Sequence, residues 1–112
     1  MLGAAGLGDI GQQFPPNDPE YADADSADLL VAALSLAREA GFQVESVDST
    51  VIAERPRLAP HLHSMRERIA HAMGVSASRV NVKATTDEGL GAIGRGEGMA
   101  ALAVALLREA GE

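Results

Sequence analysis

Cysteine and tryptophan are absent from the 112-residue sequence, and aromatic residues make up only 3% of it. Without cysteine the chain can form no disulfide, no thiolate metal site and no cysteine nucleophile, which agrees with a reducing compartment. Phe14, Tyr21 and Phe42 are the whole aromatic set, so the core must be aliphatic. Proteins that stack single-stranded nucleic acid on aromatic platforms need more such side chains.

Positive charge is also scarce, because 9 lysines and arginines face 16 acidic residues for a net charge of −7. Phosphate backbones bind basic surfaces, so this balance argues against nucleic acid as a partner. If so acidic a chain binds a phosphorylated ligand, it needs backbone N–H groups, a few placed cations or bridging metal ions. No apolar run reaches the length of a membrane helix, and the first residues lack the basic flank of a signal peptide. We therefore expect a cytoplasmic protein without a membrane partner.

The apolar residues alternate between helical and strand spacing along the chain. The pattern predicts helices over 26–40 and 60–73, ended by Gly41 and Gly74, and strands over 42–53 and 80–85. Residues 99–110 fit either a helix, by propensity, or a fully buried strand. The order of elements predicts an α/β or α+β domain over residues 1–112, with helices packed on a sheet. The short apolar start before Asp9 resembles the tail of a helix.

Two motifs could each indicate either a ligand site or an ordinary structural feature. Gly89, Gly91 and Gly94 spell G-x-G-x-x-G after a strand. A dinucleotide site also needs a following helix and a further parallel strand, and we expect a glycine loop instead. His61 and His63 could suggest a metal, but residues two apart at the start of a helix point away from each other. We expect them to be surface histidines.

A third motif, residues 85–88 (TTDE), follows the strand at 80–85. Hydroxyl and N–H groups at such a position can hold phosphate oxygens, and the adjacent carboxylates can hold a hard cation such as Mg²⁺. The same four residues are also typical of an ordinary polar turn. Asp9 and Asp18, which flank a proline-rich loop, are likewise typical turn formers.

Taken together, three segments resemble one known family over essentially the whole chain. They are residues 2–11 (LGAAGLGDIG) with Phe14-Pro15 and Asp18-Pro19, residues 80–86 (VNVKATT), and residues 94–98 (GRGEG). Their order and spacing are similar to those of the C-terminal two-thirds of 2-C-methyl-D-erythritol 2,4-cyclodiphosphate synthases.

The resemblance implies a homotrimer with active sites between neighbouring subunits. Each subunit would carry helices on one face of a mixed sheet, the sheets would line the trimer interior, and residues 99–107 would form an inner strand. The implied reaction belongs to isoprenoid precursor synthesis. In it, the 2-phosphate of 4-diphosphocytidyl-2-C-methyl-D-erythritol 2-phosphate attacks the β-phosphorus, which closes a cyclic diphosphate and expels CMP.

The resemblance also implies two groups of substrate-binding residues. In the first group Asp9 holds the erythritol hydroxyls, and its pocket is shaped by Ile10, Gly11, Phe14, Pro15, Pro16, Asn17 and Asp18. In the second group, the loop of Ala53, Glu54, Arg55, Pro56, Arg57, Leu58 and Ala59 receives cytosine and ribose from the neighbouring subunit's substrate.

The phosphates would meet a further set of residues. Thr85 and Thr86 contact them, with Thr86 as the catalytic stabiliser of the transition state, while Glu88 binds magnesium or manganese and Arg95 reaches the phosphate end. The sequence departs from the family pattern at three places. Asp87 replaces a threonine, Ala92 replaces an aromatic residue near the substrate, and Arg57 replaces a lysine.

Zinc is the second metal that the resemblance implies. Its ligands in the family lie in an Asp-x-His segment and beside a Ser-Asp-Gly-Asp loop, upstream of the first residue here, and none is present. We therefore expect an enzyme of this family whose 112-residue chain is inactive alone. The alternative is a non-catalytic, cytidine-nucleotide-binding or structural remnant of the family.

Overall fold

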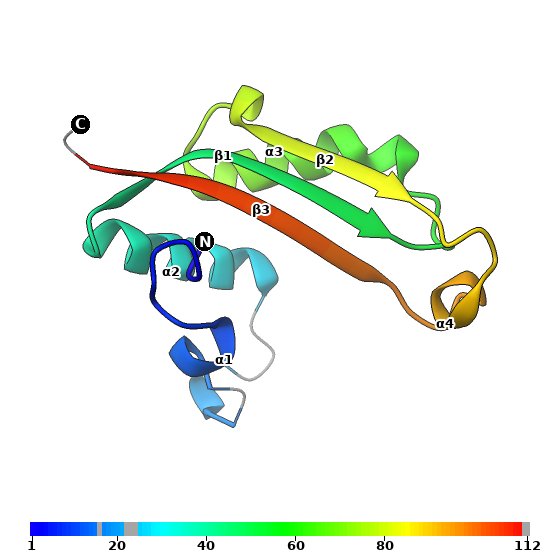
Figure 1. Ribbon diagram of the computed structural model, residues 1–112, viewed down its shortest axis with the longest axis horizontal. Coiled ribbons are helices and arrows are strands. Elements are labelled where there is room, and N and C mark those ends of the chain that lie inside the picture. The colour runs from blue at the N-terminus through cyan, green and yellow to red at the C-terminus, as the bar shows by residue number, and fades with distance from the viewer. Residues whose placement is uncertain (16, 22–24, 111–112) are drawn as a thin grey trace.

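The computed structural model describes residues 1–15, 17–21 and 25–110. Three strands form one mixed sheet in the order β2-β1-β3, and two long helices cover one of its faces (Figure 1). The elements in chain order are α1 (Ile10–Gln13), η1 (Pro19–Tyr21), α2 (Ser26–Glu39), β1 (Phe42–Ile52), η2 (Ala59–His61), α3 (Leu62–Met73), η3 (Ala77–Arg79), β2 (Val80–Thr85), α4 (Gly91–Gly94) and β3 (Ala100–Glu109). The expected mixed sheet with helices on one face is confirmed.

A side-chain cap and two glycines set the ends of the two long helices. The Asp25 carboxylate accepts a hydrogen bond of 2.8 Å from the Ala27 N–H, which caps the first turn of α2. Gly41 and Gly74 follow the two helices with φ of 95° and 66°, a left-handed conformation that glycine adopts without steric cost. The α-helical part of α3 starts at Leu62, slightly later than predicted, because residues 59–61 form a 3₁₀ turn.

Strand pairing shows which structure residues 99–110 adopt, which the sequence left open between a helix and a strand. Residues 100–109 form a strand, β3, that runs antiparallel to β1, with Ile52 opposite Ala100 and Phe42 opposite Glu109. On its other edge β1 pairs in parallel with β2, from Val47 opposite Val80 to Ile52 opposite Thr85. The prediction of a strand is confirmed, and within the described residues β3 has β1 as its one neighbour in the sheet.

The core lies between the sheet and the helical layer and is aliphatic, as expected. Leu34 of α2, Val44 of β1 and Met73 of α3 form one buried cluster, and Leu34 and Met73 are at most 2% exposed. Ala70, Val80 and Val82 form a second cluster, between α3 and β2. Burying a side chain of the size of Leu34 contributes about 1.5–3 kcal/mol to folding.

The N-terminal segment has the hydrogen bonds of a helix end. The Leu7 N–H donates to the Leu2 carbonyl at 2.9 Å, and the Gly6 N–H donates to the Gly3 carbonyl at 3.1 Å. With φ of 73° at Gly6, this pair of bonds is the Schellman arrangement that ends α-helices. The helix-tail character predicted for this segment is therefore confirmed. None of the helices in the described part of the chain has the length and apolar character needed to cross a bilayer.

Candidate functional site

The loops that follow β1 and β2 meet at one end of the sheet, because parallel strands end on the same edge. Together they enclose a hollow of about 150 Å³. The lining residues come from the predicted cytidine loop and from the end of β2: Ala53, Glu54, Pro56, Arg57, Leu58, Ala59, Ala84, Thr85 and Thr86. Two segments that are 25 residues apart in the sequence, one predicted to receive cytosine and ribose and the other to contact phosphates, thus form one hollow. Its size suits part of a ligand, since complete ligand sites usually measure about 300–1,000 Å³.

Hydrogen bonds hold the loop after β1 against the loop after β2. The Ala53 N–H donates to the Thr85 carbonyl at 3.0 Å, which extends the β1–β2 ladder by one residue. The Glu54 carboxylate accepts a 2.8 Å hydrogen bond from the Gly89 N–H. The Arg55 guanidinium lies over Gly96, where a side chain would leave only 3.1 Å to its nearest nitrogen. The loop over residues 53–59 is therefore held against the connection between β2 and β3 at two points, Gly89 and Gly96, and it contains a cis Arg55–Pro56 peptide bond.

The turn after β2 spans residues 87–90, with the Leu90 N–H donating to the Asp87 carbonyl at 3.0 Å, and Thr85 and Thr86 are exposed directly before it. The Thr86 hydroxyl oxygen accepts a 3.2 Å hydrogen bond from the Glu88 N–H, and this contact leaves the hydroxyl proton available for donation. Glu88 has φ of 53°, a region in which residues other than glycine are uncommon. The polar-turn and phosphate-contact interpretations are therefore compatible, because the turn itself exposes the two hydroxyls and the Glu88 carboxylate.

The glycine-rich segment packs against itself. A side chain on Gly94 would collide with the backbone of Gly89, so the loop can close only without one. The segment contains a single helical turn, α4, and leads into β3, which is antiparallel to β1. A dinucleotide-binding unit needs a longer helix and a parallel strand at this point, so it is excluded. Arg95, at the end of this turn, forms a two-point ion pair with Glu97, with N···O distances of 2.9 and 3.2 Å, and Ala92 is exposed.

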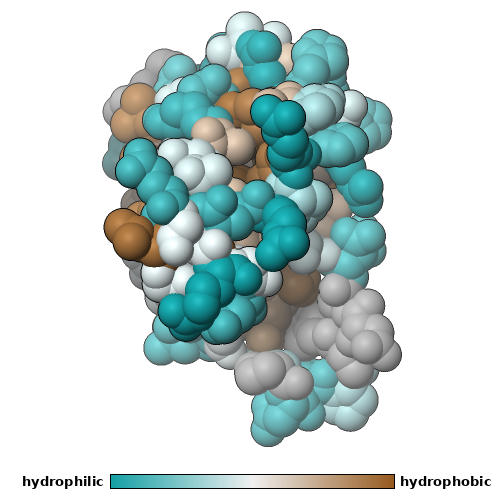
Figure 2. All heavy atoms as spheres, turned by 90° about the vertical axis from the view of Figure 1, so that its right-hand side faces the viewer, coloured by the Kyte–Doolittle hydropathy of each residue, from teal (hydrophilic) through white to brown (hydrophobic). Residues whose placement is uncertain are grey.

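Figure 2 shows this end of the molecule. Hydrophilic side chains cover much of the surface there, and hydrophobic residues are visible both in recesses between them and at the left edge, where one group protrudes. Ala84, which lines the hollow, was not among the predicted site residues. Its position directly before Thr85 was the signal, because a small residue at the end of a strand leaves room beside the following hydroxyls.

The first predicted group lies elsewhere on the chain. Asp9 caps α1, accepting from the Gln12 N–H at 2.8 Å and donating through its own N–H to the Gln12 side chain at 3.0 Å. Asp9 and Ile10 line a hollow of about 540 Å³ beside α2 and the N-terminal segment. Phe14, Pro15, Asn17 and Asp18 follow α1, with the Asp18 N–H donating to the Pro15 carbonyl at 3.0 Å, while Pro16 is outside the described residues.

A single chain does not bring the two predicted groups together. In Figure 1, α1 lies beside α2 on the helix side of the molecule, whereas α4 and the ends of β1 and β2 lie at the far right. The structure therefore brings the second group, residues 53–59, and the further set that begins at Thr85 to one end of the molecule. Asp9 and the residues up to Asp18 remain a separate surface.

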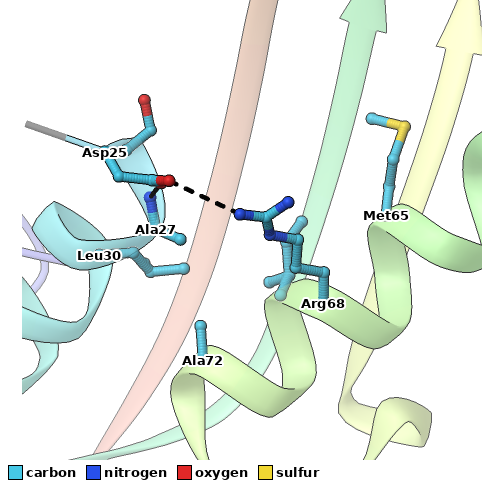
Figure 3. Close-up of a pocket in the computed structure, with 8 residues that line it drawn as sticks. Asp25, Ala27, Leu30, Met65, Arg68 and Ala72 are labelled. Carbon is cyan, nitrogen blue, oxygen red and sulfur yellow. Dashed lines mark hydrogen bonds and ion pairs between the residues drawn. The ribbon is translucent and has the colours of Figure 1, made fainter.

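A groove between α2 and α3 contains no predicted site residue. It has a volume of about 430 Å³ and a mostly apolar lining that includes Leu30, Met65 and Ala72. Figure 3 shows Asp25 and Arg68 facing each other across it, with 3.7 Å between carboxylate and guanidinium. Both side chains are more than half exposed, so this ion pair contributes little to stability. The groove offers no converging polar groups for chemistry.

No group of three or more metal-ligating side chains exists among the described residues. His61, His63 and His71 are exposed on or beside α3, and His63 lies 3.8 Å from Glu67, so the surface position expected for His61 and His63 is confirmed. The described residues do not fit a zinc site, which takes imidazole, thiolate or carboxylate ligands in tetrahedral array. Glu88 fits a different kind of metal, because Mg²⁺ is often held by one or two carboxylates together with substrate phosphates.

One further polar cluster lies on the face of the sheet opposite the helices. Lys83 of β2 donates to the Asp48 carboxylate at 2.9 Å, and the Asn81 amide donates to its other oxygen at 3.2 Å. These two hydrogen bonds, that of Lys83 first, hold the pKa of Asp48 below its usual value. The cluster joins β1 to β2 through side chains as well as through the backbone.

Comparison with known proteins identifies the family. Residues 1–108 match the model of the YgbB family. The chain is 56% identical, over 99% of its length, to the 2-C-methyl-D-erythritol 2,4-cyclodiphosphate synthase of Moorella thermoacetica, of which it covers 69%. The bifunctional IspDF of Campylobacter jejuni superposes with a TM-score of 0.92 and 45% identity, over 96% of this chain and 29% of that chain.

A Plasmodium falciparum IspF solved as a CDP complex is also similar. It superposes with a TM-score of 0.83 and 31% identity, over 97% of this chain and 65% of that chain. This chain thus spans about two thirds of the single-function relatives that it matches. Both the sequence match and the shared fold lead to one conclusion: the chain belongs to the YgbB family, the family of the 2-C-methyl-D-erythritol 2,4-cyclodiphosphate synthases.

Proposed function

We propose that this chain serves the reaction of its family, the conversion of 4-diphosphocytidyl-2-C-methyl-D-erythritol 2-phosphate to the 2,4-cyclic diphosphate with release of CMP. The observation that carries the proposal is the hollow between the loop after β1 and the end of β2. It joins Ala53–Ala59 to Thr85 and Thr86, the segments expected to contact the cytidine and the phosphates. The CDP complex of the Plasmodium relative supports a cytidine nucleotide as the ligand.

The residues at this end can position and neutralise phosphates, which is most of what phosphoryl transfer requires. Thr86 offers a hydroxyl proton, and its oxygen is already oriented by the Glu88 N–H at 3.2 Å. A donor held in this way favours the charge that develops on a phosphate oxygen in the transition state. Arg57 lines the hollow and supplies a cation for the nucleotide phosphates or ribose.

Metal ions complete the proposal. Glu88 would hold magnesium or manganese, and when bound such an ion offsets the repulsion between the two reacting phosphates. Since the described residues do not fit zinc, no step is assigned to zinc here. We expect residues 1–112 alone to bind nucleotide without releasing CMP from the substrate. Adding the upstream segment of a family member to these residues would separate the enzyme from the alternative of a nucleotide-binding remnant, because only an enzyme would then release CMP.

The separation of the two residue groups supports a site shared between chains. Asp9 and its neighbours lie on the helix side of the molecule, so a neighbouring copy must present them to the hollow at Thr86. We propose a homotrimer for this purpose. The exposed side chains Leu102, Val104 and Leu106 on β3, between 60% and 73% exposed, provide an apolar surface for the contact between copies.

Nucleotide binding tests the proposed site directly. Calorimetry with CDP should show that Arg57→Ala weakens binding by about 1–2 kcal/mol, the loss expected for one charge-assisted hydrogen bond. Arg68→Ala is the matched control, because Arg68 lines the groove between the helices and should leave the affinity unchanged. Equal affinity of Arg57→Ala and the native chain would remove Arg57 from the site, and no binding of CDP at all would contradict the proposed function.

A further inference from the structure

Glu54 belongs to the loop predicted to receive cytosine and ribose, yet its carboxylate reaches the connection between β2 and β3. It accepts a hydrogen bond of 2.8 Å from the Gly89 N–H, 35 residues further along the chain. A hydrogen bond from a backbone N–H to an ionised carboxylate is shorter and stronger than one between neutral groups. The contact lies directly after Glu88, the residue proposed to hold magnesium or manganese, and it therefore acts on the backbone of that residue.

Glu88 has a backbone conformation that neighbouring groups must hold. Its φ of 53° and the φ of 76° at Gly89 are both positive, at the two central positions of the turn that the bond from the Leu90 N–H to the Asp87 carbonyl closes. Turns with two positive φ values favour glycine, asparagine or aspartate at these positions. A glutamate at the first of them is therefore in a conformation that costs free energy, and such conformations persist only where the surroundings enforce them.

Two hydrogen bonds enforce this conformation, one on each side of the Glu88 Cα. The Glu88 N–H donates to the Thr86 hydroxyl oxygen at 3.2 Å, which holds the peptide plane before Glu88. The Gly89 N–H donates to Glu54, which holds the peptide plane after it. The orientations of these two planes define φ and ψ of Glu88, and hence the direction in which its carboxylate leaves the turn.

The loop has a second contact with the same connection, farther from the proposed metal ligand. The Arg55 guanidinium lies over Gly96, which follows α4, whereas Glu54 reaches the turn before α4 (Figure 1). Removal of the Glu54 carboxylate alone therefore releases one of the two peptide planes around Glu88 and leaves the Arg55 contact in place. We expect variants of Glu54 to fold for this reason.

We propose that Glu54 is a positioning residue that couples the nucleotide loop to the metal-binding turn. The inference rests on the proposed function, because it takes residues 53–59 as the nucleotide loop and Glu88 as the metal ligand. Glu54 is part of the loop and holds the turn by its hydrogen bond, so a nucleotide that orders the loop also orders the turn. Such coupling is reciprocal: a metal ion at Glu88 strengthens nucleotide binding by the same factor.

Amide exchange in the ligand-free chain tests the positioning without any nucleotide. NMR of the full chain gives the rates at which the Glu88 and Gly89 amide protons exchange with water. Glu54→Ala should raise both rates by about 2- to 10-fold, the effect of losing one hydrogen bond, although only Gly89 loses its own partner. Glu54→Gln keeps an acceptor oxygen and should stay close to the native rates. The Gly74 amide, which donates to the His71 carbonyl at 3.1 Å, is the internal control.

CDP binding with and without Mg²⁺ tests the coupling. Calorimetry should show that Mg²⁺ strengthens CDP binding to the native chain. Glu54→Ala should reduce this gain by about 2- to 10-fold and leave the metal-free affinity near its native value, whereas Glu54→Gln retains the gain. Glu88→Gln sets the level expected when the metal ligand itself is lost. Glu67→Ala is the matched control, because it removes the same charge from an exposed position on α3 and should bind as the native chain does.

The outcomes separate positioning from charge and from a general structural role. Acceleration confined to the Gly89 amide would mean that the bond holds no more than its own donor, which overturns the proposal. Equal effects of Glu54→Ala and Glu54→Gln would assign them to charge, and equal weakening of CDP binding with and without Mg²⁺ would make Glu54 a structural residue of the loop; either result overturns the coupling. If the native chain binds no CDP, the proposed function fails, and the exchange rate at Glu88 still decides whether Glu54 holds the turn.

Discussion

At the scale of single residues, Asp48 gives the most direct test of the electrostatics. Its pKa is lowered from 3.8, mainly by the hydrogen bond from Lys83, so folding favours the ionised carboxylate. The resulting stability is present above pH 3.8 and is lost as the pH falls through the lower pKa of the folded state. Lys83→Gln should therefore raise the pKa of Asp48 towards 3.8, as measured by NMR titration of the carboxyl carbon.

Asp48→Asn provides the complementary stability measurement. Urea unfolding should show the native chain more stable than this variant near neutral pH, with the difference shrinking as the pH falls through the lowered pKa of the folded-state carboxyl. A difference that stays constant over this range would assign the effect to packing. An unchanged Asp48 pKa in Lys83→Gln would contradict the role given to Lys83.

Individual site residues could be named from the sequence only in part. The second group, residues 53–59, and the phosphate set from Thr85 to Arg95 were named from the resemblance to a family, and the structure brings both to one end of the sheet. The Glu54–Gly89 hydrogen bond and the placement of Arg55 over Gly96 could not be predicted, because each joins loops that are 35 or more residues apart. The bulge at Glu45 was also missed: two successive polar residues, Glu45 and Ser46, interrupt the alternation there, but only the pairing with β3 shows which residue is extra.

At the scale of elements, Leu34 tests the packing of α2 on the sheet. It is 2% exposed and contacts the cluster of Val44 and Met73. Leu34→Ala should lower the free energy of unfolding by about 2–5 kcal/mol, because the cavity that it leaves cannot fully collapse. Denaturation in urea measures the change, and Val31→Ala, at a position of α2 that is 44% exposed, is the control with an expected change within about 0.5 kcal/mol.

The comparison of these two variants tests which face of α2 packs on the sheet. If Leu34→Ala and Val31→Ala lower the free energy of unfolding by the same amount, α2 is not anchored through the face that carries Leu34. If Val31→Ala alone were costly, the helix would have to be rotated relative to the sheet from the orientation in this structure.

Local signals set the limits of most elements before any tertiary contact is considered. Gly41 and Gly74 end their helices in the left-handed conformation, and the Asp25 cap starts α2. Residues 99–110 could not be decided in the same way, since Ala and Leu favour a helix while the partner strand favours β3. The backbone of β1 supplies ten residues of pairing to that segment, and this long-range contact overrides local propensity.

At the scale of the whole molecule, the feature of interest is a row of apolar side chains on β3 that a single chain leaves exposed. Leu102, Val104 and Leu106 alternate along the strand, so their side chains lie on one face of the sheet. Their register partners on β1 are Thr50, Asp48 and Ser46, all polar. A contiguous apolar row that is 60–73% exposed beside a polar strand is the kind of patch that is typical of interaction surfaces.

The last prediction is that this row holds copies of the chain together. Light scattering after gel filtration should give the mass of a trimer for the native chain and a lower mass for Val104→Asp, because a buried, unpaired carboxylate at an interface costs several kcal/mol. Val31→Asp is the matched control: it makes the same substitution at an exposed valine on α2, away from the row, and should leave the mass unchanged. A native chain that stays monomeric would contradict the shared site, since Asp9 could then not reach the hollow at Thr86. Equal dissociation in both variants would instead trace the effect to added charge, which would leave the β3 row without a role in assembly.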